Sequence, residues 1–248
     1  MTVKSNLGVQ SWCFRNFKSN DALIEQLKKL GITCVELCGV HVDFKNPATF
    51  DEVIAKYKAA GIAIQSIGVN TVTEDESASE GGFIFAKKAG CGVVAVSFPM
   101  KNHLPAFRVA EKLAAKYGVK TAIHNHGGHD WLGSTTALDY VFELTNEHVG
   151  LCLDTAWALD AGEDPITLAK KFHGRLYGVH VKDFIFDRKG KPEDVVVGTG
   201  NLDLPQLMKL LCEINFDGSL TLEYEGDVEN PVPALAKCVA AIKKVLPF

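Results

Sequence analysis

A phrase of ten residues recurs four times in the first half of the chain, and it consists of a helix-like segment that ends in glycine and runs into β-branched residues. The copies read KKLGITCVEL, KAAGIAIQSI, KKAGCGVVAV and AKYGVKTAIH. Their glycines, at positions 31, 61, 90 and 118, lie 30, 29 and 28 residues apart. Glycine suits the left-handed residue that ends a helix, and each following run has the length and composition of a strand. The phrase therefore predicts a regular alternation of helices and buried strands.

Strand-like runs continue through the second half as HVGLCLD, GRLYGVHVKD and DGSLTLEYE, and LGVQSWCF precedes the first repeat. Helix-like stretches near residues 164–173 and 203–214 separate the later runs. We expect eight strands, which end near residues 13, 38, 69, 97, 125, 154, 182 and 225. This alternation is typical of parallel βαβ units. Because such barrels need ~250 residues, the 248 residues predict an α/β fold with one domain over 1–248, a (β/α)8 TIM barrel.

The alternative α/β architecture is an open, doubly wound sheet. A dinucleotide-binding sheet of that kind carries GxGxxG directly after its first strand. The residues that follow LGVQSWCF are RNFKSND, which contain no glycine. We therefore prefer the closed barrel.

The charge balance argues against a nucleic-acid binder, because the formal net charge is −4 and no run of five basic residues occurs. No stretch approaches the roughly 20 apolar residues of a membrane span. The first residues, MTVKSNLGVQ, lack the apolar segment of a signal peptide. The seven cysteines form no CxxC pair, which is typical of reduced, buried thiols. We expect a cytoplasmic protein that binds neither nucleic acid nor membrane.

Ionisable residues gather at the predicted carboxyl ends of the strands, the end that carries the active site in TIM barrels. Strands buried on both faces are otherwise nearly all apolar, so each charge at a strand end needs a reason. The residues in question are Glu36, His124, His126, Asp154, His180, Lys182, Asp183, Glu223 and Glu225. We expect them to meet at one face of the barrel.

Four of these residues come from consecutive strands and have the alternation needed to converge: His124, Asp154, His180 and Glu223. Two imidazoles and two carboxylates suit one divalent metal ion, such as Mn, Co, Zn, Fe or Mg. Such an ion polarises a carbonyl and stabilises an enediolate as the neighbouring carbon loses a proton. Taken singly, each residue has an ordinary alternative. A histidine at a strand end is often a satisfied polar group, and Asp154 could simply cap the next helix.

The expected catalytic residues are Glu223, His126 and Lys182. Glu223 is the first candidate for removing the proton next to the carbonyl. His126 is the second, because it shares the face of His124 and an imidazole titrates near neutral pH. Lys182 has two interpretations, as the group that holds an oxyanion or phosphate and as a structural partner of Asp183.

The expected substrate-binding residues are Glu36, His41, Trp157 and Glu225. Glu36 and His41 belong to VELCGVH at the end of the second strand, and Glu225 lies two residues beyond the predicted ligand Glu223. Trp157 could stack on a sugar ring, and it could equally fill the core at the start of a helix. The direction of the loop that carries His41 is not given by the sequence.

Two connections are long enough to cover the pocket. GGHDWLGST, residues 127–135, follows the fifth strand and contains His129, which we expect to lie in a loop. DFIFDRKGKPEDVVVGTGN, residues 183–201, follows the seventh strand and has 19 residues. Its GTGN could contact a phosphate, whereas most of its charges are expected to be solvated.

Motifs along nearly the whole chain resemble one family, the xylose isomerase-like TIM barrels known as sugar phosphate isomerases and epimerases. The motifs are GVQSWCFRNF, GITCVELCGVH, AIHNHGG, GLCLDTAWALDAGEDP, GRLYGVHVKDF, VVVGTGNLDLPQLMKLL and NFDGSLTLEYEGD. Similar proteins in this family are ketose 3-epimerases, inosose dehydratase and endonucleases that act at abasic sites. The resemblance implies a small carbohydrate substrate, and a homodimer is an expectation from the resemblance alone.

The resemblance also implies one divalent metal ion held by Glu, Asp, His and Glu at four strand ends. Asp154, His180 and Glu223 match the last three of these ligands, whereas His124 stands where the family carries the first glutamate. In the epimerases the two metal-bound glutamates serve as acid and base on opposite sides of the substrate carbon, and only one remains here. Trp157 stands where many relatives carry a histidine that contacts the sugar.

These observations predict a metal-dependent isomerase or epimerase that abstracts a proton next to a carbonyl. A lyase or dehydratase on a keto sugar begins with the same step, and His124 in place of the glutamate moves weight toward it. A non-catalytic sugar-binding barrel is a further alternative, although it has no use for so many buried charges. An abasic-site nuclease is disfavoured, because that branch of the family uses three metal ions and a DNA-binding surface.

Overall fold

The computed structural model describes residues 5–128 and 130–246, and the predicted barrel is confirmed as a closed ring of eight parallel strands. Around the barrel the strand order is β1-β10-β7-β6-β5-β4-β3-β2. The strands are β1 (Leu7–Gln10), β2 (Cys34–Leu37), β3 (Ala63–Thr71), β4 (Val93–Ser97), β5 (Lys120–His124), β6 (Val149–Asp154), β7 (Leu176–Val181) and β10 (Ser219–Leu222).

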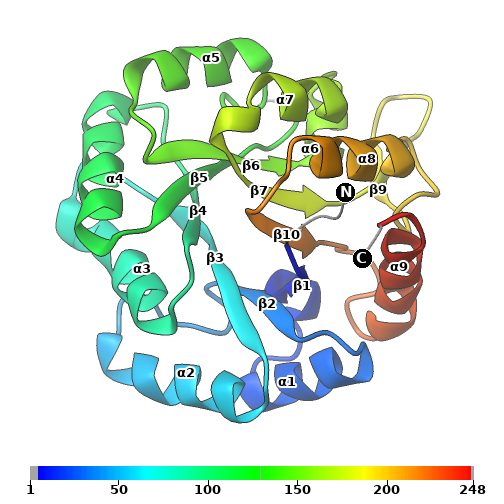
Figure 1. Cartoon of the computed structure of the whole chain (residues 1–248), viewed down its shortest axis with the longest axis horizontal. Coiled ribbons are helices and arrows are strands. Elements are labelled where there is room, and N and C mark those ends of the chain that lie inside the picture. The colour runs from blue at the N-terminus through cyan, green and yellow to red at the C-terminus, as the bar shows by residue number, and fades with distance from the viewer. Residues whose placement is uncertain (1–4, 129, 247–248) are drawn as a thin grey trace.

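Helices surround these strands on the outside, and Figure 1 shows them as an outer layer around the barrel. Each buries an apolar face against the strands and exposes a polar face. In α8, for example, Leu207, Met208 and Leu211 are buried. The helices are α1 (Asn20–Lys29), α2 (Phe50–Ala59), α3 (Glu76–Ala89), α4 (His103–Tyr117), α5 (Thr135–Leu144), α6 (Thr155–Asp160), α7 (Pro165–Lys171), α8 (Leu204–Glu213) and α9 (Val232–Val245).

The repeated glycines end helices as the sequence predicts. Their left-handed φ angles are 64°, 72°, 75° and 67°, at Gly31, Gly61, Gly90 and Gly118. Glycine has no Cβ, so it adopts this conformation without strain and lets the chain turn from helix to strand. At the other end of α1, the side chain of Ser19 caps the helix by accepting the Ala22 N–H at 3.2 Å.

Two strands end earlier than the sequence predicts. β1 ends at Gln10, because the next residues form a short 3-10 helix, Ser11–Phe14, and the Gln10 side chain accepts the Trp12 N–H at 3.1 Å. β10 ends at Leu222, and the N–H of Glu223 still donates to the carbonyl of Val181 on β7 at 3.2 Å. Glu223 therefore remains fixed to its neighbouring strand although β10 has ended.

The 19-residue connection after β7 contains a hairpin, which the sequence pattern did not indicate. β8 (Phe184–Phe186) pairs with β9 (Pro192–Asp194) in antiparallel fashion. At the exposed tip, the Asp187 carboxylate accepts the N–H groups of Lys189 and Lys191 at 2.7 and 2.9 Å. The expectation of solvated charges holds at this tip, whereas the two strands of the hairpin approach the barrel.

All seven cysteines are buried and carry no disulfide, in agreement with the expectation from their spacing. Four of them, Cys13, Cys91, Cys212 and Cys238, belong to the main hydrophobic core, which also contains the fully buried Val9, Val35 and Ile67. In the part of the chain that the structure describes, no helix combines the length and the apolar character needed to cross a bilayer.

Candidate metal centre

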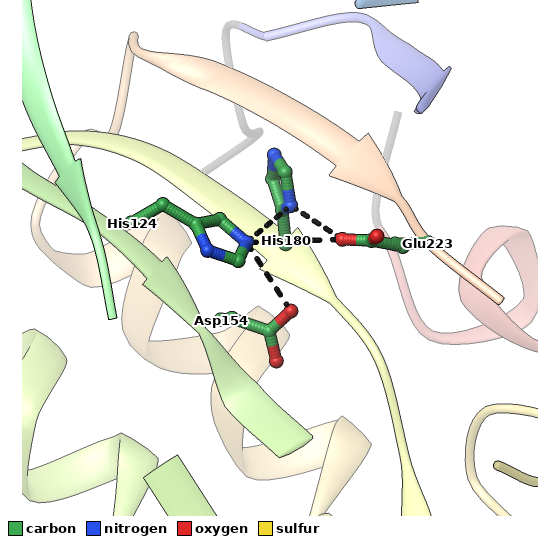
Figure 2. A group of neighbouring side chains, drawn as sticks. All are labelled: His124, Asp154, His180 and Glu223. Carbon is green, nitrogen blue, oxygen red and sulfur yellow. Dashed lines mark hydrogen bonds and ion pairs between the residues drawn. The ribbon is translucent and has the colours of Figure 1, made fainter. Parts of the chain in front are cut away.

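Four side chains at the carboxyl end of the barrel form one compact cluster, which we call the ring and which Figure 2 shows. It consists of His124 from β5, Asp154 from β6, His180 from β7 and Glu223, which directly follows β10. Each offers one potential ligand atom, and these atoms all lie within 4.8 Å of one another. All four residues are buried. The structure thus brings together the set that the sequence analysis expected to converge.

Strand register and one amide side chain account for this convergence. Asp154 and His180 are direct neighbours across β6 and β7. Asn125, the residue after His124, clasps the backbone of Asp154, because its Nδ2 donates to the Asp154 carbonyl at 3.1 Å and its Oδ1 accepts the Asp154 N–H at 2.8 Å. Since side chains alternate along a strand, this clasp leaves His124 directed at the ring.

Asp154 fills both roles that the sequence left open. Its Oδ1 accepts the N–H groups of Ala156 and Trp157, each at 2.9 Å, and so caps α6. Its Oδ2 is buried and has no hydrogen-bond partner among the described residues, and Nε2 of His124 lies 3.5 Å away. A buried carboxylate oxygen without a donor is unfavourable. A cation bound in the ring would satisfy this oxygen.

The two imidazoles of the ring face each other. Nε2 of His124 lies 3.0 Å from Nδ1 of His180, and Oε2 of Glu223 lies 2.7 Å from the same Nδ1. Glu223 also lies 3.8 Å from Nε2 of His124. The converging atoms are thus nitrogens and oxygens, the ligand types that zinc and related divalent ions bind.

The electrostatics of the ring favour positive charge. Burial lowers the pKa of His124, but the neighbouring carboxylates of Asp154 and Glu223 together outweigh burial and leave that pKa raised. Burial also lowers the pKa of His180, yet the neighbouring Cys152 and Glu36 bring it well above its ordinary value. Protons or a metal cation can supply this charge, and the donor set fits a divalent ion.

A cavity of about 520 Å³ adjoins the ring, and His124, His180 and Glu223 form part of its wall. This volume lies within the range of small-molecule sites. Three further residues that the sequence analysis selected also line it: His126, Trp157 and Glu225.

His126 and Trp157 form an aromatic wall beside the ring. The centre of the His126 ring lies 4.7 Å from that of His124 and 5.7 Å from that of Trp157. Burial lowers the pKa of His126, and the nearby His124 lowers it further. The neutral imidazole is therefore favoured, a form that can both donate and accept a hydrogen bond. Trp157 packs edge-on against Phe184 of the hairpin, with ring centres 5.0 Å apart.

Lys182 is fully buried and forms an ion pair with Glu225, rather than with Asp183. Its Nζ also lies 5.0 Å from the centre of the Trp157 ring. Burial lowers the pKa of Lys182, but the Glu223 carboxylate and others nearby outweigh burial and raise it. Lys182 is therefore a charged group that compensates the carboxylates around the cavity.

Asp183 has a different partner, the GTGN segment. Its carboxylate accepts the N–H groups of Gly198, Gly200 and Leu202 at 2.9, 2.8 and 2.9 Å. The backbone donors that GTGN could have offered to a phosphate are thus engaged within the protein. This contact holds the connection after β7 in place.

Two residues expected at the substrate lie elsewhere. Nε2 of His41 lies 2.9 Å from the carbonyl of Phe17, a contact that joins two loops outside the cavity lining. Glu36 is fully buried on β2, and its carboxylate contacts His180 instead of the cavity. Burial raises the pKa of Glu36, but the charge and hydrogen bond of His180, together with the hydrogen bond from Ser66, outweigh burial and lower it. Glu36 is therefore an ionised group beneath the ring.

Trp12 is the main cavity residue that the sequence analysis missed. It is 39% exposed, its Nε1 donates to Glu225 at 2.9 Å, and the Arg15 guanidinium lies 5.3 Å from the centre of its ring. The sequence did offer an indication, because Trp12 lies two residues after the end of β1, at the end of the barrel that carries the ring. The short 3-10 helix, which the sequence analysis took as strand, hid its position.

The two connections expected to cover the pocket have separate contacts. In residues 127–135, Trp131 donates its Nε1–H to the carbonyl of Phe98 at 2.8 Å, which ties the segment to the end of β4. The expectation for His129 lies outside the described residues. In the hairpin, Asp194 accepts the N–H of Glu225 at 3.3 Å, so β9 reaches the residues that follow β10.

The sequence of this chain is similar to those of known proteins. A family model described as a xylose isomerase-like TIM barrel matches residues 24–245. The inosose dehydratase of Clostridium botulinum (strain Alaska E43 / Type E3) is 30% identical over 150 residues, which cover 54% of this chain and 50% of that enzyme. This chain spans about half the length of the curated relatives it matches.

Solved structures share the fold over nearly the whole chain. The 3-keto-D-glucoside 4-epimerase YcjR of E. coli aligns with a TM-score of 0.75 and 18% identity, over 97% of this chain and 100% of that one. The IolI protein, solved with a binding zinc atom, aligns with a TM-score of 0.77 and 17% identity, over 98% of this chain and 100% of that one. At these identities the likeness extends to the fold alone.

Proposed function

Because the chain belongs to the xylose isomerase-like TIM barrel family, we propose that it is a metal-dependent lyase that removes water from a keto sugar or keto polyol. The observation that carries this proposal is the asymmetry of the ring. Of its two carboxylates, Glu223 lines the cavity, whereas Asp154 is absent from the lining formed by the described residues and uses one oxygen to cap α6. A bound substrate therefore meets one ring carboxylate.

The ring supplies the ligands for one divalent ion: His124, Asp154, His180 and Glu223. Zinc is the first candidate, since the IolI neighbour was solved with zinc and the donors are two nitrogens and two carboxylates. Such an ion, when bound, polarises the carbonyl of a neighbouring sugar and so acidifies the adjacent C–H bond.

Glu223 is the proposed base for that C–H proton. Burial raises the pKa of Glu223, but the charge of Lys182 and the hydrogen bonds from the ring histidines outweigh burial and lower it well below its usual range. The carboxylate is thus ionised at neutral pH and able to accept a proton. Because it lines the cavity, it is the ring carboxylate within reach of a ligand.

Loss of water requires that a hydroxyl on the next carbon leaves with a proton. His126 lines the same cavity and lies beside the ring, so it is the proposed partner of the departing hydroxyl. Trp12 and Trp157 supply apolar surface for the C–H face of a sugar or cyclic polyol. In this step the C–H proton goes to Glu223, the C–OH bond breaks, and the hydroxyl leaves as water with the proton that Glu223 has taken up, while the neutral His126 donates a hydrogen bond to the departing oxygen.

Two observations favour dehydration over the isomerase or epimerase reaction that the sequence analysis placed first. His124 stands where the epimerases carry a second metal-bound glutamate, so the ring lacks the pair that works on both faces of a carbon. The matching curated relatives in this comparison include inosose dehydratases. Both point to chemistry that needs one carboxylate base.

Epimerisation or isomerisation is the second candidate function. The observation that favours it is His126, which lines the cavity with Glu223 and whose lowered pKa leaves it able to accept a proton. Two groups that exchange protons with a ligand are the minimum that two-sided transfer requires.

Incubation with inosose and a panel of ketohexoses in deuterated water tests the proposal. We expect mass spectrometry to detect a product one water lighter than its substrate. Deuterium that enters next to the carbonyl without loss of water would instead establish the isomerase or epimerase. Metal analysis of the purified protein should find about one equivalent of divalent ion, the count expected for a single four-ligand site.

A further inference from the structure

Both carboxylate oxygens of Glu36 contact side chains that come from other strands of the barrel. Its Oε1 lies 2.5 Å from Nε2 of Gln10 on β1 and 2.9 Å from Nε2 of His180 on β7. Its Oε2 accepts the hydroxyl of Ser66 on β3 at 2.6 Å. The residue is fully buried and outside the cavity lining, so a ligand cannot be its partner.

This arrangement decides which nitrogen of His180 carries hydrogen. Gln10 and Ser66 donate to the two oxygens of Glu36, so this carboxylate acts as an acceptor toward the groups around it. Nε2 of His180 must therefore be the N–H that donates to Glu36, and Nδ1 is the nitrogen that faces Glu223 at 2.7 Å and His124 at 3.0 Å. A metal ion bound in the ring would take the place of the proton on Nδ1, while the Nε2–H continues to donate to Glu36.

We propose that Glu36 is a positioning residue for the metal centre, which fixes the tautomer and the ring plane of His180 so that Nδ1 binds the ion. The proposal rests on the metal site of the proposed function. Gln10 and Ser66 complete it, because they hold the carboxylate in place from two other strands. A carboxylate that accepts the second N–H of a ligand histidine also makes that histidine a stronger ligand, and losing such a partner typically weakens metal binding by roughly 10- to 100-fold.

The burial of Glu36 supports a functional role rather than a purely structural one. A charged carboxylate enclosed by the barrel is unfavourable unless a partner compensates it, and an apolar residue would fill the same space without this requirement. Glu111 offers a matched control. Like Glu36, it is a buried glutamate. Its carboxylate accepts the backbone N–H of Asn146 at 2.7 Å, and it lies on α4, outside the ring and its cavity.

The test compares Glu36→Gln with Glu111→Gln in the full chain. Glutamine keeps the shape and one acceptor oxygen but removes the charge. We expect Zn²⁺ titrated by calorimetry to bind Glu36→Gln about 10- to 100-fold more weakly than wild type, with Glu111→Gln unchanged. Equal zinc affinity in wild type and Glu36→Gln would overturn the proposal.

A second measurement uses the unmodified protein and does not depend on how a variant folds. ¹⁵N NMR of the zinc-loaded wild type should find Nδ1 of His180 bound to zinc and Nε2 protonated. Zinc on Nε2 would overturn the positioning role while leaving the metal site and the proposed function intact. A wild type that binds no Zn²⁺ would overturn both. Zinc bound through Nδ1 in a protein without dehydratase activity would support the inference and count against the function alone.

Discussion

The two histidines of the ring have similar sequence positions, yet the structure supports them differently. His124 ends β5 and His180 lies near the end of β7, and each presents one nitrogen to the ring. The other nitrogen of His180 contacts Glu36 at 2.9 Å. The other nitrogen of His124, Nδ1, is buried without a hydrogen-bond partner within residues 5–128 and 130–246. The β7 side of the ring is therefore braced, and the β5 side is held through the backbone clasp of Asn125.

This difference predicts which of the two histidines tolerates substitution better. A substitution at His124 breaks no contact outside the ring, because its outer nitrogen has no hydrogen-bond partner among the described residues. A substitution at His180 would strand the Glu36 carboxylate in the barrel interior, which is strongly unfavourable. The less supported position is also the one at which the family resemblance implies a glutamate in place of the histidine of this chain.

The largest effect on turnover is expected from a substitution of Glu223, the carboxylate that contacts both ring histidines. Glu223→Gln should lower turnover by about 10²- to 10⁴-fold, because it removes the proposed base. Steady-state kinetics on the substrate identified in deuterated water would measure this. Glu111→Gln, a buried carboxylate outside the ring, serves as the control. Near-normal turnover in Glu223→Gln would assign the base to another group.

Introducing glutamate at each histidine tests the comparison directly. His180→Glu should weaken Zn²⁺ binding by more than about 100-fold, because it removes a ligand and places a second carboxylate against Glu36. His124→Glu should retain zinc within about 10-fold, since glutamate supplies a carboxylate ligand as the family resemblance implies, and the outer nitrogen that it removes has no partner among the described residues. Calorimetric titration measures both affinities. Equal losses in the two variants would show that the difference in support has no energetic consequence.

Substitutions in the cavity walls beside the ring should have a smaller effect, and mainly on substrate binding. Trp12→Ala should raise KM by about 3- to 10-fold with little change in kcat, since an aromatic contact is worth roughly 0.5–1.5 kcal/mol. Trp12 is fixed by Glu225 and Arg15, so it is preformed for binding. Trp157→Ala, on the wall beside His126, is the matching variant. A fall in kcat without a change in KM would place Trp12 in the chemical step instead.

The smallest effect is expected at Asp194 of the hairpin, where burial raises the pKa to about 6. A raised folded-state pKa gives stability that is complete below the unfolded value of 3.8 and is lost as the pH rises through about 6. Asp194→Asn never ionises, so its Tm should rise relative to wild type as the pH increases from 4 to 7. Thermal unfolding at both pH values measures this, and a constant difference would contradict the raised pKa. The residue is partly exposed, so the shift should be small.

The faces on which the strand-end side chains lie could be predicted from the sequence, because the periodicity of a strand determines them. Once eight strands were placed, alternation put His124 and His126 on one face with Asn125 on the other, and the structure agrees. Two failures had local causes. The 3-10 helix after β1 hid Trp12, because a short apolar run looks the same in either conformation. The hairpin after β7 was hidden among exposed charges.

Glu36 and Lys182 show the other limit of the sequence. Both were expected to act on substrate, yet Glu36 is enclosed by β1, β3 and β7, and Lys182 forms an ion pair with Glu225. These partners are far away in sequence, and they come together only because the barrel closes. A pattern along the chain does not specify which strand a side chain meets across the barrel.

The sequence by itself determined the repeat, the barrel and the set of ionisable residues at its active end, because these follow from local periodicity and from helix-ending glycines. Only the tertiary structure decided how those residues divide into ring, cavity wall and support. That division depends on which buried charges compensate one another across strands, and such pairing exists only after the barrel has excluded water from their surroundings.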